Sequence, residues 1–151
     1  MYIQNSIYDS FLEKIVDRAN KIKLGPPMDA ETQMGPLATQ GQMKLIEGEI
    51  SQAKNVGANI LHGGKKPTNL NGGWFYEPTI VDCNDQKMKI VDTELFGPVL
   101  SVLRFKTEEE AIKLANDTKY GLAAGVFTKN GARSLRVTKA LRPGIVWVNT
   151  Y

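Results

Sequence analysis

The sequence has very few side chains of the kinds that usually act as nucleophiles or metal ligands, with one cysteine, Cys83, and one histidine, His62. A single cysteine excludes an internal disulfide framework and fits a reducing compartment. One cysteine and one histidine are too few for a zinc site without many carboxylates, and no such acidic cluster occurs in the sequence. A Ser-His-Asp or Cys-His catalyst built from this chain would have to use His62.

The sequence also lacks long apolar runs and an excess of one charge. Its longest apolar stretch, 120–127, is far shorter than the ~18 residues that span a bilayer. Met1 is followed by no basic region and apolar core, so we expect no signal peptide. The net charge of +3 is spread along the chain, which predicts neither a nucleic-acid nor a membrane partner. We therefore expect a cytoplasmic protein.

What is present is typical of a globular domain: 151 residues, of which 42% are hydrophobic and 23% are charged. The length predicts one domain with a substantial core. Apolar residues at three- and four-residue steps predict a helix over 7–22, started by a capping box of Ser6 and Asp9 and stopped at Gly25. A second helix is predicted to follow Thr39, and short strands are predicted over 58–62 and 76–81. The glycine-rich segment 63–73 is predicted to be a flexible loop.

The last third of the chain alternates between two kinds of element. Apolar strands are predicted over 99–105, 122–127 and 145–149, and helices lie between them. A helical crossover between successive strands requires parallel pairing, so we predict an α/β fold with one parallel sheet, right-handed crossovers and helices on both faces, giving three layers. Ligands of such sheets bind beyond the carboxyl ends of the strands.

Three polar residues have ordinary structural interpretations. Cys83 lies between Asp82 and Asp85, which would raise the pKa of its thiol, so we interpret it as structural or incidental. His62 precedes two glycines and is interpreted as a surface loop residue. Gln42 is three residues after Thr39, where its side chain would complete a capping box by bonding the Thr39 amide.

The segment Glu94-Leu95-Phe96-Gly97-Pro98-Val99 allows two interpretations. A carboxylate can accept two hydrogen bonds from a vicinal diol such as a ribose, and a nearby ring can pack against a flat heterocycle. A glycine beside them allows close approach of a ligand to the backbone. Alternatively, Glu94 is an ordinary glutamate and Phe96 a core residue before a proline turn.

This hexapeptide resembles the Glu-Ile/Leu-Phe-Gly-Pro-Val signature of the aldehyde dehydrogenase superfamily. Further similar motifs follow one another in the family's order: Gly25-Pro26-Pro27-Met28-Asp29, Met34-Gly35-Pro36, Gly63-Gly64, Tyr76-Glu77-Pro78-Thr79, Ala115-Asn116, Tyr120-Gly121-Leu122-Ala123 and Gly144-Ile145-Val146-Trp147-Val148-Asn149. The resemblance covers essentially the whole chain. It implies part of a catalytic domain (1–151) of a longer enzyme, without the coenzyme-binding and oligomerisation domains.

The resemblance also implies roles for particular residues. Glu94 would bond the nicotinamide ribose, Phe96 would line the nicotinamide, and Gln42 would approach the same ribose in some members. The intact enzyme would use NAD or NADP to oxidise a small-molecule aldehyde to a carboxylic acid through a cysteine thioester, as a homodimer or homotetramer. No catalytic residue is assigned to this chain, because the family's nucleophile and base would lie before Met1, and we expect the chain alone to be inactive. A short non-enzymatic binding or interaction module with the same fold is the alternative.

Overall fold

The computed structural model of the protein describes residues 1–70 and 72–150. The chain divides into two compact units, one of Met1 and Ile3–Arg104 and the other of Tyr2 and the residues from Phe105 onward. Because each unit has its own sheet and its own helices, the two are described separately below.

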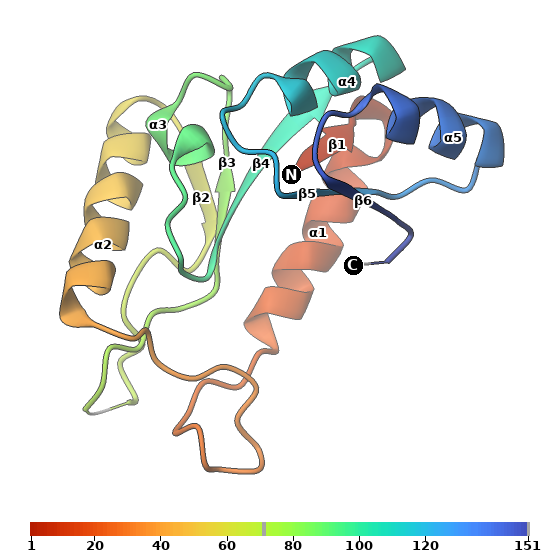
Figure 1. Ribbon diagram of the computed structural model, residues 1–151. Helices are drawn as coiled ribbons and strands as arrows, with labels where there is room; N and C mark the ends of the chain where they lie inside the picture. The colour runs from red at the N-terminus through yellow and green to blue at the C-terminus, as the bar shows by residue number, and fades with distance from the viewer. Residues whose placement is uncertain (71, 151) are drawn as a thin grey trace. The chain divides into compact units, whose positions relative to one another are not determined.

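The first unit is a mixed sheet with helices. In chain order its elements are β1 (Tyr2–Gln4), the 3-10 turn η1 (Asn5–Ile7), α1 (Tyr8–Asn20), α2 (Gln40–Asn55), β2 (Asn59–His62), β3 (Thr79–Asp82), α3 (Lys89–Asp92) and β4 (Val99–Phe105). The strands form one sheet in the order β1-β4-β3-β2. β3 pairs in parallel with β4, whereas β2 pairs antiparallel to β3. Figure 1 shows β2, β3 and β4 between α2 and α1, the three layers expected of an α/β fold.

Apolar side chains of α1 and of the sheet form one core cluster of the first unit. Its buried members are Ile3, Tyr8, Leu12, Ala19, Ile80 and Val102. Phe11, predicted on the apolar face of α1, is 38% exposed. The helix predicted after Thr39 is confirmed as α2, and four of its apolar residues are buried: Met43, Ile46, Ile50 and Ala53.

The start and end of α1 differ from the prediction. Ser6 lies in the 3-10 turn that runs directly into the helix, and the N-cap is Ile7, without a side-chain cap hydrogen bond. The capping box of Ser6 and Asp9 is therefore wrong, because the turn places Ser6 before the cap position. The helix also ends at Asn20, before Gly25, which does not adopt the left-handed conformation of a glycine cap.

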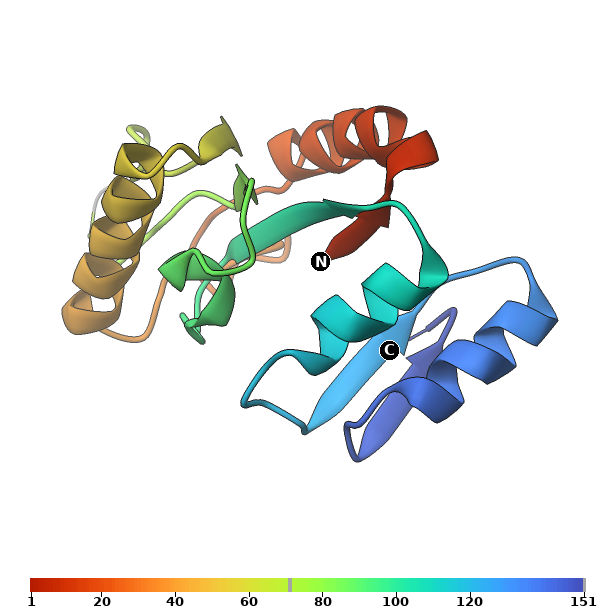
Figure 2. The same cartoon turned by 90° about the horizontal axis from the view of Figure 1, so that it is seen from above.

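The second unit contains two helices and two strands. Its elements are α4 (Glu108–Asn116), β5 (Ala123–Val126), α5 (Gly131–Ala140) and β6 (Ile145–Val148). β5 and β6 pair in parallel, with Ala123 opposite Ile145, as the predicted strand-helix-strand pattern requires. Figures 1 and 2 show α4 and α5 on the same face of this strand pair.

The prediction that 99–105, 122–127 and 145–149 form a single sheet is wrong. β4 matches its predicted bounds but belongs to the four-stranded sheet, and β5 and β6 form a separate two-stranded sheet. The physical reason is that β4 already has β1 on one edge and β3 on the other. With both edges hydrogen-bonded, β4 has none left for a strand of the second unit.

One face of the β5–β6 pair is exposed. Residues along both strands alternate between exposed and partly buried. The exposed positions include Ile145 at 50% and Trp147 at 42%, and the preceding Leu122 is 86% exposed. A surface that exposes large apolar side chains side by side is typical of a contact face.

The glycine-rich segment 63–73 contains a close backbone approach. Gly63 has a φ of 66°, and a Cβ there would come within 2.2 Å of the Pro78 carbonyl oxygen. The position therefore requires glycine. Asn71, also part of the predicted flexible loop, lies outside the described residues.

Candidate functional site

The first turn of α2 provides one side of the candidate site. Thr39 is the N-cap, and its Oγ1 accepts a hydrogen bond from the Gln42 backbone N–H at 3.1 Å. This half of the predicted capping box is confirmed. The other half is wrong, because the Gln42 side chain points elsewhere and its Nε2 donates to the Leu95 carbonyl oxygen. The helix start is therefore tied to the middle of the hexapeptide, 53 residues further along the chain.

The hexapeptide turns sharply at its third residue. Leu95 is 7% exposed and anchors the turn in the core, whereas Phe96 is 75% exposed and has a φ of 47°. A non-glycine residue in the left-handed region is uncommon and persists where the surroundings fix it. The interpretation of Phe96 as a core residue is therefore wrong, and the other interpretation, an available aromatic ring, agrees with its exposure.

Glu94 is exposed next to this turn. Within residues 1–70 and 72–150 its carboxylate has neither a hydrogen-bond partner nor an ion-pair partner. A carboxylate with both oxygens available has the acceptor pattern that a vicinal diol requires.

Gly97 explains how the hexapeptide packs on α2. A Cβ at this position would lie 2.2 Å from Cδ1 of Ile46, a residue with 0% exposure. Any larger side chain would overlap a buried atom of the helix that carries Gln42. The glycine thus allows the turn to sit directly against the α2 surface.

The structure therefore brings the predicted cofactor-binding residues into one region, because Gln42 contacts the backbone of the segment that holds Glu94 and Phe96. The contact between Gln42 and Leu95 was not predicted, because the sequence contains no signal that pairs these two positions. The close packing of Gly97 on Ile46 was also missed, although a glycine before a proline and a strand is a hint of close backbone approach.

Cys83 and His62 do not join this group. The Cys83 thiol is buried and donates a weak hydrogen bond to the Val81 carbonyl at 3.6 Å. Burial raises the pKa of the Cys83 thiol, which is the opposite of what a nucleophile needs. The interpretation of His62 as a surface loop residue is wrong, because His62 is the half-buried last residue of β2 and pairs with Ile80 in the sheet.

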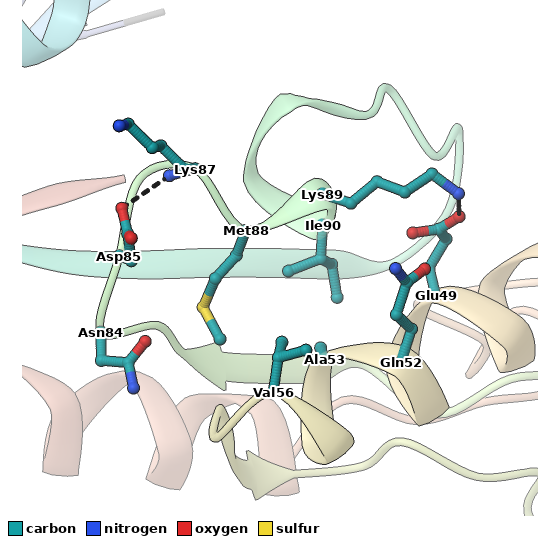
Figure 3. Close-up of a pocket in the computed structure, with 10 residues that line it drawn as sticks. All are labelled: Glu49, Gln52, Ala53, Val56, Asn84, Asp85, Lys87, Met88, Lys89 and Ile90. Atoms are coloured by element: carbon teal, nitrogen blue, oxygen red, sulfur yellow. Dashed lines mark hydrogen bonds and ion pairs between the residues drawn. The ribbon is translucent and has the colours of Figure 1, made fainter.

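A separate cavity of about 350 Å³ lies between the second half of α2 and the segment 84–90. Figure 3 shows Lys89 reaching Glu49 at one end of it, where the Lys89 ammonium donates to Glu49 Oε1. The second oxygen of this buried carboxylate has no partner among the described residues. The lining includes neither Gln42 nor the hexapeptide, so this cavity is distinct from the candidate site.

In the described part of the chain we find neither a cluster of metal ligands nor a transmembrane helix. No group of three or more His, Cys, Asp or Glu side chains is arranged there to hold a metal ion. None of its helices has the length and apolarity needed to cross a membrane.

Fold and site together define an α/β protein with parallel strands, in which an exposed carboxylate and an exposed ring share one fixed turn. Sequence comparison gives the family: the model of the aldehyde dehydrogenase family matches residues 1–151, and the chain belongs to this family. The signature resemblance and the α/β fold class predicted from sequence are thereby confirmed.

Similar proteins include betaine aldehyde dehydrogenases. The enzyme of Mesorhizobium japonicum is 44% identical over 100% of this chain, and the chain covers 31% of that protein. The crystal structure of betaine aldehyde dehydrogenase from Staphylococcus aureus in complex with NAD+ is 46% identical, with a TM-score of 0.97 over 99% of this chain and 30% of that one. A (Z)-2-((N-methylformamido)methylene)-5-hydroxybutyrolactone dehydrogenase of Acinetobacter baylyi is 46% identical over 100% of this chain and 31% of its own length. The chain thus spans about 30% of the length of these relatives.

Proposed function

We propose that residues 1–151 form part of the catalytic domain of an NAD(P)-dependent aldehyde dehydrogenase, with the coenzyme-binding and oligomerisation domains supplied by other parts of the protein. Membership of the family supports the reaction class, the oxidation of an aldehyde to a carboxylic acid. The similarity to a betaine aldehyde dehydrogenase in complex with NAD+ supports the cofactor. We expect a cytoplasmic homodimer or homotetramer.

The observation that carries the proposal is the exposed, unpartnered carboxylate of Glu94 next to the exposed ring of Phe96 in the described part of the chain. Glu94 would accept hydrogen bonds from the two hydroxyls of the nicotinamide ribose, and Phe96 would pack against the nicotinamide ring. When bound, NAD(P) would supply the hydride acceptor of the reaction. The work of these two side chains is to bind and orient, without proton transfer.

The nucleophile and the general base of the proposed reaction lie outside these residues. The buried Cys83, with its raised pKa, is a poor candidate for the cysteine that forms the thioester. We therefore propose that the 151-residue chain alone is inactive. Incubated with NAD+ or NADP+ and a panel of aldehydes, it should give no rise in absorbance from reduced cofactor. Turnover that is lost on Cys83→Ser would contradict this assignment.

The central test uses the full-length protein that carries this segment. Glu94→Gln keeps the size of the side chain but removes its charge, and a hydrogen bond to a charged group contributes ~1.5–3 kcal/mol. We expect about a ten- to a hundredfold loss in kcat/KM for the dinucleotide. Phe96→Ala should also lower kcat/KM for the dinucleotide. Because both substitutions disturb the positioning of the nicotinamide for hydride transfer, the isotope effect with deuterated aldehyde should increase.

Glu13→Gln is the matched control, since Glu13 is an exposed carboxylate on α1 and should tolerate the change with unaltered kinetics. Normal turnover in Glu94→Gln would refute the site assignment. A full-length protein that binds no dinucleotide and oxidises no aldehyde would instead favour the alternative, a binding module that retains the fold.

A further inference from the structure

The junction between β5 and α5 contains an asparagine followed by a glycine, Asn130-Gly131, and both residues are exposed. Asn130 is the N-cap of α5, and its Oδ1 accepts a hydrogen bond from the Arg133 backbone N–H at 2.9 Å. Gly131 is the first residue of the helix, where a backbone N–H has no intrahelical acceptor. A Cβ added at Gly131 would have no neighbouring atom within 4 Å, so packing does not require glycine at this position.

The backbone nitrogen that follows an asparagine can close a five-membered ring on the asparagine side chain. The Gly131 nitrogen, after losing its proton to base, attacks Cγ of Asn130, so a C–N bond forms and the side-chain nitrogen leaves as ammonia. Water then opens the resulting succinimide at one of its two carbonyls, which gives aspartate or isoaspartate. This substitution and hydrolysis need no oxidant, cofactor or second protein. A following glycine favours the attack, because no Cβ hinders its nitrogen.

The folded conformation opposes this ring closure. Closure requires Cβ of Asn130 and the Gly131 nitrogen to be nearly eclipsed about the Cα–C bond, whereas the ψ of 109° at Asn130 holds them far apart. The Asn130 carboxamide is held by its cap hydrogen bond to Arg133, and the Asn130 N–H donates to Thr128 Oγ1 at 3.2 Å. Thr128 is held in turn, because the Asn149 side chain accepts from its N–H at 2.9 Å and donates to its carbonyl at 3.1 Å. The ring can therefore close only after the first turn of α5 has opened.

We propose that Asn130 is a site of spontaneous deamidation, at which opening of the first turn of α5 lets the Gly131 nitrogen displace ammonia from the side chain. The native cap sets the rate, because only the opened fraction of the molecules reacts. The site lies in the second unit and involves neither Glu94 nor Phe96. The inference is therefore independent of the proposed function.

The two products should affect α5 in opposite ways. Aspartate at 130 keeps the acceptor for the Arg133 N–H and places a negative charge at the positive end of the helix, which stabilises the helix. Isoaspartate routes the main chain through the side-chain carbon, so the chain gains one backbone atom before Gly131 and the cap geometry is lost. Asn130→Asp reproduces the first product, and it should melt at the same temperature as wild type or higher.

Incubation of the full-length protein at mildly alkaline pH, followed by peptide mapping with mass spectrometry, measures the conversion of Asn130 directly. The peptide that contains residue 130 should gain the mass difference between an amide and a carboxylic acid, and it should separate into an aspartate and an isoaspartate form. Conversion should be at least about tenfold faster in urea than in the native protein, since unfolding removes the need for local opening. The second Asn-Gly pair of the sequence, 71–72, is quantified separately in its own peptide.

Gly131→Ala tests the chemistry without disturbing the fold. The added Cβ enters open space, and alanine favours a helix, so the variant should be at least as stable as wild type. Conversion at 130 should nevertheless slow by at least about tenfold, both in the native protein and in urea, because the methyl group hinders the attacking nitrogen.

Thr128→Val tests whether the cap controls the rate. It removes the acceptor of the Asn130 N–H and should accelerate conversion in the native protein by about two- to tenfold, the range expected for one hydrogen bond. Thr128→Ser keeps the hydroxyl and should convert at the wild-type rate. In urea neither substitution should have an effect. Thr118→Val is the matched control, since it removes an equivalent acceptor, for the Tyr120 N–H at 3.3 Å, and should leave the rate at 130 unchanged.

The rates of conversion decide whether the proposal stands. Faster conversion in urea, suppression by Gly131→Ala and acceleration by Thr128→Val together support it. Equal rates in the native protein and in urea would overturn it, because the fold would then exert no control. Conversion that continues unchanged in Gly131→Ala would rule out the ring closure. A native rate that Thr128→Val leaves unaltered would rule out control by the cap, and a melting curve of each variant confirms that it is folded during the incubation.

Discussion

The packing of Gly97 on Ile46 predicts that alanine at position 97 is destabilising for a steric reason only. The φ of Gly97 lies outside the left-handed region, so the backbone itself would accept alanine. The added Cβ, however, would lie 2.2 Å from Ile46 Cδ1. Ile46 is fully buried, so the change is a case of overpacking and should cost ~1–3 kcal/mol.

The same geometry predicts which second substitution relieves the clash. Ile46→Val deletes Cδ1, and the next atoms near the new Cβ would be Ile46 Cγ1 at 3.3 Å and Leu37 Cδ2 at 3.5 Å. Alone, Ile46→Val should cost ~0.5–1.5 kcal/mol. The double variant Ile46→Val with Gly97→Ala should be destabilised by about the same amount as Ile46→Val alone, or by slightly less. The reason is that alanine lowers the conformational entropy of the unfolded chain. The double variant should therefore be more stable than Gly97→Ala alone.

Urea unfolding followed by the fluorescence of Trp74 measures these differences, in a Trp147→Phe background that removes the signal of the second unit. Gly48→Ala is the control, because Gly48 lies inside α2 and a Cβ added there would have no neighbouring atom within 4 Å. It should stabilise the protein by ~0.5–1 kcal/mol, as alanine does in an exposed helix. If Gly97→Ala costs the same with and without Ile46→Val, the steric reasoning is refuted.

Three further predictions concern buried polar groups. Burial, with Glu47 and Glu77 adding to it, raises the pKa of Tyr76 to about 12. The unfolded chain loses this proton first, near pH ~10. The free energy of unfolding should therefore fall as the pH rises from about 10 to 12. In urea titrations, Tyr76→Phe should remove the contribution of Tyr76 to this fall. Lys89→Met should lower the free energy of unfolding by ~1–3 kcal/mol, because it leaves the buried Glu49 carboxylate without its ion-pair partner. In thermal unfolding, adding Glu49→Leu should restore most of this loss. An equal loss of stability in the double variant would contradict the prediction. The Cys83 thiol should react with a disulfide reagent at least ~10 times more slowly in the native chain than in urea, because it is buried with a raised pKa.

Local sequence patterns predicted the elements well. The bounds 99–105 of β4 match those that its β-rich run predicts, and Thr39 caps α2 as expected. These successes share a cause, since a periodic apolar stripe or a capping hydroxyl acts over a few residues. The identity of the two strands that flank β4 could not be predicted, because pairing joins residues far apart in the chain.

The candidate site was predictable only in part for the same reason. Glu94 and Phe96 were singled out by their motif, and the exposure of both agrees with a ligand-facing role that remains a proposal. The direction of the Gln42 side chain depends on a carbonyl group 53 residues away. Likewise, no residue pattern within the hexapeptide predicts the left-handed φ of Phe96, since this conformation is uncommon for a residue other than glycine.

The exposed face of the β5–β6 pair has a consequence for measurements of stability. Exposed side chains such as Leu122, Ile145 and Trp147 contribute to the stability of the folded state only when another surface removes them from water. By mass action, any surface that covers them shifts the folding equilibrium of the second unit. Its apparent midpoint of unfolding should therefore depend on protein concentration and on the presence of a surface that covers this face.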